Sequence, residues 1–205
     1  LEPEGRNTTP AITIAALKAI DIFKDTNIDP ILLILSSDHQ IEDLNEFQLA
    51  IKNSIDMASQ GNLIIFGVPP TFPATGYGYI KSENILDRKQ DLASKVDHFI
   101  EKPNLEAAEN YIKDKKYSWN SGMFLFKASV FLRELEKYSP QVIKSCKKAL
   151  KENLLDMDFQ RLDKEAFKDC PDISIDVAVM EKTKLGSVLP LNVGWSDVGS
   201  WKSIW

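Results

Sequence analysis

The fold class follows most directly from one apolar run with a polar end, Pro30-Ile31-Leu32-Leu33-Ile34-Leu35-Ser36-Ser37-Asp38-His39. The apolar part predicts a strand buried on both faces, and the polar end predicts a loop after it. A helix is expected from about Asn45 to Ser59, ended by Gly61, and a second buried strand over Leu63–Val68. Strand, helix and strand at this spacing predict a right-handed βαβ unit and an α/β fold.

Further helices and strands extend this unit in both directions. Thr8 or Thr9 is expected to cap a helix that has Pro10 in its first turn, and Asn104 is expected to cap another. The run 122–126 predicts a third buried strand. Pro190 places a strand over 188–191 at a sheet edge, because proline has no N–H to donate to a ladder.

Length and composition exclude several classes of protein. With 205 residues, 43% of them hydrophobic, the chain is expected to form one domain over residues 1–205. A formal charge of −5 argues against a nucleic-acid or membrane-surface binder. The sequence shows no apolar run of the roughly 18 residues that a membrane span needs, and no signal-peptide pattern is visible, so neither is expected. Cys146 and Cys170 form no C-x-x-C pair, which fits a reducing cytoplasm.

Two acids are placed where a metal ligand is expected. Asp197 lies in Gly194-Trp195-Ser196-Asp197-Val198-Gly199-Ser200-Trp201, a run with two tryptophans and two glycines in eight residues. Asp38 follows a predicted strand, and α/β sheets bind ligands just beyond such strand ends. Mg²⁺ takes one or two carboxylates together with phosphate oxygens, so we expect Asp38 and Asp197 to form a pair of metal ligands. Taken alone, Asp38 also fits a helix cap, and the glycine-tryptophan run also fits a turn.

The run Pro73-Ala74-Thr75-Gly76-Tyr77-Gly78-Tyr79 has the composition of a ligand loop. Glycines let backbone amides approach a ligand, so Gly76 and Gly78 are expected near the substrate. The ring of Tyr77 can cover a sugar or a base. A glycine-rich hairpin explains the same residues equally well.

Three further side chains suit a sugar phosphate. Glu101 can accept sugar hydroxyls, and Lys102 can meet a phosphate as a point charge, provided that Pro103 ends the strand so that both face the ligand. Asn120, in Trp119-Asn120-Ser121-Gly122 before the third strand, offers a donor and an acceptor. The alternatives are a surface ion pair for Glu101 and Lys102 and a turn asparagine at position 120.

Two other segments carry weaker signals. The run Glu2-Pro3-Glu4-Gly5-Arg6-Asn7-Thr8-Thr9-Pro10 leads into a helix start, where exposed amides attract phosphate or a polar base edge. The Glu2 carboxylate complements the N1–H and N2 donors of guanine. Asp176 lies in an acidic and apolar stretch, and residues 175–180 fit either a short helix or a strand.

Taken in order, these motifs resemble the motif series of mannose-1-phosphate guanylyltransferases, which are sugar nucleotidyltransferases. The resemblance implies a Rossmann-like nucleotide-diphospho-sugar transferase fold, with a mixed and mostly parallel sheet flanked by helices. It implies the conversion of GTP and mannose 1-phosphate into GDP-mannose and pyrophosphate, with the sugar phosphate attacking the α-phosphorus directly. Polysaccharide biosynthesis uses such products.

The resemblance also implies roles for single residues. Mg²⁺ or Mn²⁺ is expected on Asp38 and Asp197, and these two residues and Lys102 are the expected catalytic set. Substrates are expected to contact the following residues: Glu2, Arg6, Asn7, Gly76, Tyr77, Gly78, Glu101, Asn120 and Asp176.

The chain departs from the family pattern at both ends. It has no glycine-rich loop with an arginine and a lysine to hold the triphosphate, and that loop is expected upstream of Leu1. Without the loop, the chain is expected to be inactive alone. It also lacks the C-terminal β-barrel of longer members, some of which isomerise mannose 6-phosphate. A sugar-nucleotide-binding regulatory subunit and an enzyme for another pair, such as UTP with glucose 1-phosphate, stay open, as does a homo-oligomer.

Overall fold

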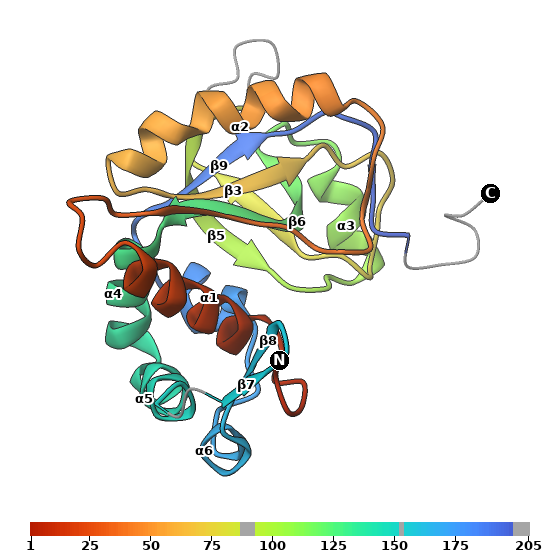
Figure 1. Ribbon diagram of the computed structural model, residues 1–205. Helices are drawn as coiled ribbons and strands as arrows, with labels where there is room; N and C mark the ends of the chain where they lie inside the picture. The colour runs from red at the N-terminus through yellow and green to blue at the C-terminus, as the bar shows by residue number, and fades with distance from the viewer. Residues whose placement is uncertain (87–92, 152–153, 199–205) are drawn as a thin grey trace. The chain divides into compact units, whose positions relative to one another are not determined.

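The computed structural model describes residues 1–86, 93–151 and 154–198 (Figure 1). The chain divides into two compact units, each built from two segments. The first unit comprises Leu1–Leu32 and Lys127–Thr183, and the second comprises Leu33–Phe126 and Lys184–Trp205. The chain therefore passes from the first unit to the second, returns to the first and ends in the second.

The first unit is mainly helical. Its elements in chain order are α1 (Thr8–Ile22), α4 (Ala128–Tyr138), α5 (Pro140–Ala149), β7 (Leu154–Asp156), β8 (Phe159–Arg161), α6 (Lys164–Lys168) and the π-helical turn η1 (Asp176–Met180). Helix α1 packs against α4 and α5, and its buried face includes Ile12, Thr13 and Ala16. The segment 175–180, which the sequence left open, is helical.

The start of α1 differs from the expectation by one residue. Asn7 caps the helix, with φ +63° and its Oδ1 accepting from the Thr8 N–H at 2.9 Å. Thr8 instead accepts from the Ile175 N–H at 2.9 Å, and the Thr9 N–H donates to the Ile173 carbonyl at 3.2 Å. Neither threonine caps α1, because both form hydrogen bonds that link the start of the helix to the segment before η1.

The second unit holds a six-stranded sheet in the order β1-β6-β3-β9-β5-β4 and a two-stranded ladder of β10 and β2. Its elements are β1 (Ile31–Ile34, at the boundary between the units), β2 (Gln40–Ile41), α2 (Leu44–Ser59), β3 (Leu63–Val68), β4 (Tyr79–Ser82), β5 (Ser94–Ile100), α3 (Leu105–Tyr111), β6 (Tyr117–Lys127), β9 (Gly186–Pro190) and β10 (Trp195–Ser196). Helix α2 runs along the β3 and β9 side of the sheet (Figure 1).

The predicted helix and strand around Gly61 are confirmed. Asp43 caps α2 by accepting from two backbone N–H groups, those of Asn45 and Glu46. Every residue of β3 is buried, and Phe47 of α2 meets Phe66 of β3 with ring centroids 6.2 Å apart. Asn104 caps α3 as expected.

The sheet is mixed, as predicted, but it is not mostly parallel. Strands β3 and β9 run parallel, whereas β3–β6, β4–β5, β4–β6 and β5–β9 are antiparallel. Antiparallel pairs outnumber parallel ones in the described part because the long strand β6 runs against both β3 and β4. Asn120, expected just before the third strand, lies inside β6 because that strand begins at Tyr117.

Two strands have the opposite burial from the one expected. Strand β1 is an edge strand with no fully buried residue, Leu33 is 36% exposed, and β6 separates β1 from β3. Strand β9 is central and fully buried although it contains Pro190. Its antiparallel neighbour β5 pairs only with Ser187 and Val188 in the described register, so Pro190 lies beyond the last β5 partner and its missing N–H breaks no bond there.

Candidate functional site

The β10–β2 ladder brings together the two segments that carry the predicted metal ligands. Trp195 is opposite Ile41 and Ser196 is opposite Gln40, in antiparallel register. Asp197 follows the last paired residue of β10, and Asp38 lies two residues before the first residue of β2. The Trp195 indole Nε1–H donates to His39 Nδ1 at 3.2 Å, so the histidine has the hydrogen-bonded structural contact that is common for a residue in its position. Asp38 itself is exposed.

Asp197 is held by a tyrosine from a different loop. The Tyr77 hydroxyl donates to Asp197 Oδ1 at 2.9 Å. Partial burial, and then the neighbouring carboxylate, raise the pKa of Tyr77 to about 12, so the phenol keeps its proton at neutral pH. The next residue, Val198, has φ +50°, a strained conformation for a β-branched side chain. Gly199, Ser200 and Trp201 lie outside the described residues.

An aromatic cavity of about 690 Å³ opens beside this contact. Its wall consists of Thr71, Phe72, Pro73, Ala74, Thr75, Gly76, Tyr77, Trp119, Trp195 and Ser196. The Tyr77 ring meets Trp119 and Trp195 edge-on, with centroids 5.1 and 5.8 Å apart. A cavity of this size with flat apolar walls can hold one sugar or base ring.

Gly78, Glu101 and Asn120 come together although they lie on separate strands or strand ends. The Asn120 N–H donates to the Gly78 carbonyl at 2.8 Å. A Cβ added to Gly78 would lie 2.9 Å from Glu101 Oε2 and 3.4 Å from Asn120 Cβ. The Asn120 Oδ1 accepts from the Gly122 N–H at 2.9 Å, which fixes the amide plane. The glycine therefore leaves room for a carboxylate and an amide to share one small surface.

The predicted strand break at Glu101 and Lys102 occurs one residue earlier than expected. Strand β5 ends at Ile100, and Lys102 has φ +44°, so the reversal lies at the lysine and not at Pro103. The Lys102 Nζ is 3.1 Å from Glu101 Oε1, and both side chains are more than half exposed. Strained non-glycine residues cluster at functional sites, and in the second unit Lys102 and Val198 flank predicted site residues.

The remaining predicted substrate residues, Glu2, Arg6, Asn7 and Asp176, belong to the first unit. Arg6 donates to Glu4 Oε1 at 2.6 Å and to the Lys168 carbonyl at 2.9 Å. Glu2 lies at a second cavity of about 380 Å³, and burial there raises the pKa of its carboxyl group. Asn7 caps α1, and Asp176 opens η1.

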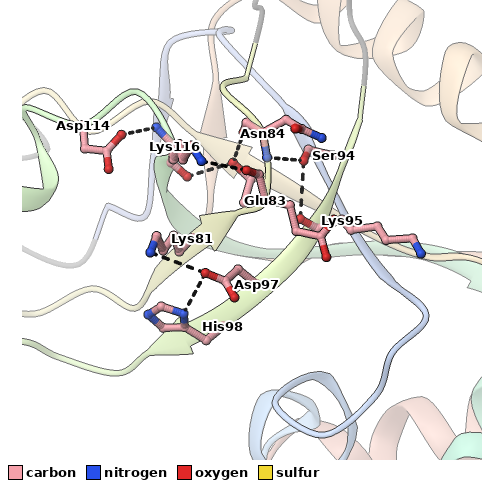
Figure 2. Close-up of polar contacts among 10 residues, drawn as sticks. Lys81, Glu83, Asn84, Ser94, Lys95, Asp97, His98, Asp114 and Lys116 are labelled. Carbon is pink, nitrogen blue, oxygen red and sulfur yellow. Dashed lines mark hydrogen bonds and ion pairs between the residues drawn. The ribbon is translucent and has the colours of Figure 1, made fainter.

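A further polar cluster lies on β4, β5 and the segments next to them (Figure 2). Asp97 Oδ2 lies 3.4 Å from Lys81 Nζ and 3.3 Å from His98 Nδ1. The Lys116 Nζ donates to the Glu83 carbonyl at 2.8 Å. All these charged side chains are at least partly exposed, so the cluster is a surface ion-pair network. A variant in this cluster can therefore serve as a control for variants in the candidate site.

Sequence reasoning gave no role to Phe72 or Trp119, which the structure places in the cavity wall. The Phe72 and Trp119 rings meet edge-on with centroids 4.8 Å apart. Trp119 lies in the quoted run 119–122, whereas Phe72 lies just before the quoted run 73–79. The signal available for both was an aromatic side chain three or four residues before a glycine.

The donor types at Asp38 and Asp197 suit a hard cation. Within the described ranges, no three His, Cys, Asp or Glu side chains come together as a preformed metal cage. Mg²⁺ rarely uses such a cage, because it keeps water and substrate phosphate in its shell and takes one or two carboxylates from the protein. Two loop carboxylates, one of them oriented by a neutral phenol, fit that requirement. Within the same ranges, no helix is long and apolar enough to cross a membrane.

The mixed α/β fold is that of the nucleotidyl transferases, and the chain belongs to the nucleotidyl transferase family, whose model matches residues 1–205. It is 48% identical to a mannose-1-phosphate guanylyltransferase of Escherichia coli K12, over all of this chain and 43% of that protein. It is 50% identical to the xanthan biosynthesis protein XanB of Xanthomonas campestris, over all of this chain and 42% of that protein. The chain thus spans less than half the length of these relatives.

Solved structures show the same fold. A mannose-6-phosphate isomerase from Helicobacter pylori superposes with a TM-score of 0.80 at 38% identity, over 96% of this chain and 72% of that one. A protein from Thermus thermophilus described as a mannose-1-phosphate geranyltransferase gives 0.81 at 30% identity, over 99% and 55% of the two chains. A UDP-glucose pyrophosphorylase from Acinetobacter baumanii, at 13% identity and a TM-score of 0.56, is similar in fold alone.

Proposed function

We propose that this chain is the nucleotidyl-transferring part of an enzyme that forms GDP-mannose and pyrophosphate from GTP and mannose 1-phosphate. The observation that carries the proposal is the convergence of Gly78, Glu101 and Asn120 in the same unit as an aromatic cavity and the Tyr77–Asp197 contact. The identity to relatives named mannose-1-phosphate guanylyltransferase supports this pair of substrates.

The sugar is assigned to the Gly78 cluster. Glu101 accepts hydrogen bonds from sugar hydroxyls, and the Asn120 amide contributes a donor in a plane that Gly122 fixes. Gly76 and Gly78 let the backbone approach the ring. Lys102 binds the phosphate of mannose 1-phosphate. Before the substrate binds, the ion pair with Glu101 holds the ammonium group beside the sugar site.

The reaction needs no nucleophile from the protein. An oxygen of mannose 1-phosphate attacks the α-phosphorus of GTP, a new O–P bond forms, the bond between the α-phosphorus and its bridging oxygen breaks, and pyrophosphate leaves. The chain then contributes by positioning the two phosphates in line and by balancing their charge. A divalent cation, Mg²⁺ or Mn²⁺, held by Asp38 and Asp197 would supply most of that charge balance.

Guanosine is assigned to residues of the first unit. Glu2 matches the two guanine donors, Arg6 matches a phosphate or a base edge, and Asn7 marks the start of α1, where backbone N–H groups attract negative charge. Arg6 holds Glu4 and the Lys168 carbonyl through its Nε and Nη2 atoms, and these contacts do not use all five N–H donors of the guanidinium group, so it can also contact nucleotide. Asp176 is assigned to the substrate as well.

The test measures pyrophosphate release by the full-length protein that contains this chain. Asp38→Asn and Asp197→Asn should each lower kcat/KM by about 100-fold or more, because each removes one charge-stabilising group. Asp97→Asn is the matched control, since Asp97 carries the same charge in the surface cluster of Figure 2. Full activity in both site variants would contradict the proposed roles of Asp38 and Asp197.

A further inference from the structure

The Tyr77 hydroxyl donates its hydrogen bond to a carboxylate. Its ring is held on three sides, with centroid distances of 6.2 Å to Phe72, 5.1 Å to Trp119 and 5.8 Å to Trp195. A ring packed in this way has little freedom, so the direction of its O–H group is set by the cavity wall. That direction ends on Asp197 Oδ1 at 2.9 Å.

The backbone around Asp197 is fixed independently. Strand β10 holds the preceding residue against β2, with Ser196 opposite Gln40. On the other side, Val198 adopts φ +50° and its N–H donates to Ser196 Oγ at 3.2 Å. With the main chain held at both neighbours, the carboxylate orientation depends on side-chain torsions, and the Tyr77 hydrogen bond acts on those torsions directly.

We infer that Tyr77 is a positioning residue, whose hydroxyl orients the Asp197 carboxylate for a divalent cation and thereby sets the metal affinity of the site. The inference rests on the proposed metal role of Asp197. Hydrogen-bond partners of metal ligands behave in this way generally, because they fix the ligand geometry before the ion binds. Trp195 extends the same arrangement, since its ring packs on Tyr77 while its indole N–H holds His39.

A direct substrate role for the hydroxyl predicts a different result. If Tyr77 bound sugar through its oxygen, removing that oxygen would raise the KM for mannose 1-phosphate at any metal concentration. If it acts through Asp197, the same change weakens metal binding, and saturating metal restores turnover with the sugar KM unchanged.

The experiment titrates Mn²⁺ alone into the full-length protein and follows the free ion by electron paramagnetic resonance. Tyr77→Phe keeps the packed ring and removes the hydroxyl, and we expect its Mn²⁺ affinity to fall by about 10- to 100-fold. Tyr111→Phe is the control, because Tyr111 stacks on Tyr117 at 4.3 Å and is not part of the cavity wall. Thermal unfolding of each variant confirms that it is folded.

The outcomes separate this inference from the proposed function. Asp197→Asn should lose Mn²⁺ binding, and if it binds as the wild type does, or if the wild type shows no saturable binding, the metal role itself is wrong. If Asp197→Asn loses the ion while Tyr77→Phe binds as tightly as Tyr111→Phe, the metal role stands and the positioning role is wrong. A raised KM for mannose 1-phosphate at saturating Mn²⁺ would also overturn the positioning role.

Discussion

A single methyl group at Gly78 should weaken sugar binding without unfolding the protein. The added Cβ would lie 2.9 Å from Glu101 Oε2, whereas ordinary contacts begin at 3.4 Å, so the carboxylate must retreat by 3.4 − 2.9 = 0.5 Å. Glu101 is the mobile partner, since its side chain is 56% exposed. The backbone at Gly78 has no positive φ, so the substitution acts through this contact and not through strain.

The displacement is large enough to cost one charged hydrogen bond to the sugar. Such a bond contributes about 1.5–3 kcal/mol, which corresponds to a rise of about 10- to 100-fold in the KM for mannose 1-phosphate. The assay is pyrophosphate release at saturating GTP and metal. Asp97→Asn is the control variant, because Asp97 lies in the surface cluster of Figure 2 and has no assigned contact with a substrate.

A double-mutant cycle tests the cause. If Gly78→Ala acts by displacing the carboxylate, it should have little further effect in a Glu101→Ala background. An unchanged KM in Gly78→Ala, an equal rise in Asp97→Asn, or full additivity with Glu101→Ala would each refute the reasoning.

Three further changes probe the charges, the pH dependence and the stability of the second unit. Lys102→Met should raise the KM for mannose 1-phosphate by about 10-fold and make that KM less dependent on salt. The reason is that salt screens the attraction between an exposed ammonium group and a phosphate, and the variant has lost this attraction. Steady-state kinetics at two ionic strengths would show both effects. Burial raises the pKa of Tyr117, so its contribution to the free energy of unfolding is complete below the usual tyrosine pKa of about 10 and is lost as the pH rises through the folded-state value. The free energy of unfolding of the wild type should therefore fall relative to that of Tyr117→Phe as the pH rises through this range, as urea unfolding would show. A difference between the two proteins that does not change with pH would contradict the shift. Asp43→Ala removes the cap of α2 and should cost about 1 kcal/mol in urea unfolding, while an unchanged Cm would mean that the two capping bonds contribute nothing.

The sequence predicted those helices and strands whose ends depend on residues nearby in the chain, such as an apolar run or a terminating glycine. Strand β3 and helix α2 lie where the apolar runs and Gly61 place them. Strand order was not accessible in this way, because pairing depends on segments far apart in the chain. The burial of β1 and β9 therefore came out reversed, with the more apolar run at the edge and the proline-containing strand at the centre.

The candidate site shows the same division. The motifs identified Gly78, Glu101 and Asn120, and the structure brings them together, although their roles stay predictions. The hydrogen bond from Tyr77 to Asp197 joins residues 120 positions apart, and no local pattern contains it. The strained backbone at Lys102 and Val198 also has no signature in a sequence, because neither residue type favours a positive φ.

The most direct measurement of the central claim is pyrophosphate release by the full-length protein in four reactions, combining GTP or UTP with mannose 1-phosphate or glucose 1-phosphate. The account predicts rapid release from GTP with mannose 1-phosphate and, for each single exchange of base or sugar, a kcat/KM lower by at least about 100-fold, because unpaired polar groups remain in the site. Equal or faster release from UTP with glucose 1-phosphate would contradict the substrate assignment. Silence in all four reactions from a folded protein that still binds GDP-mannose would contradict the transferase itself.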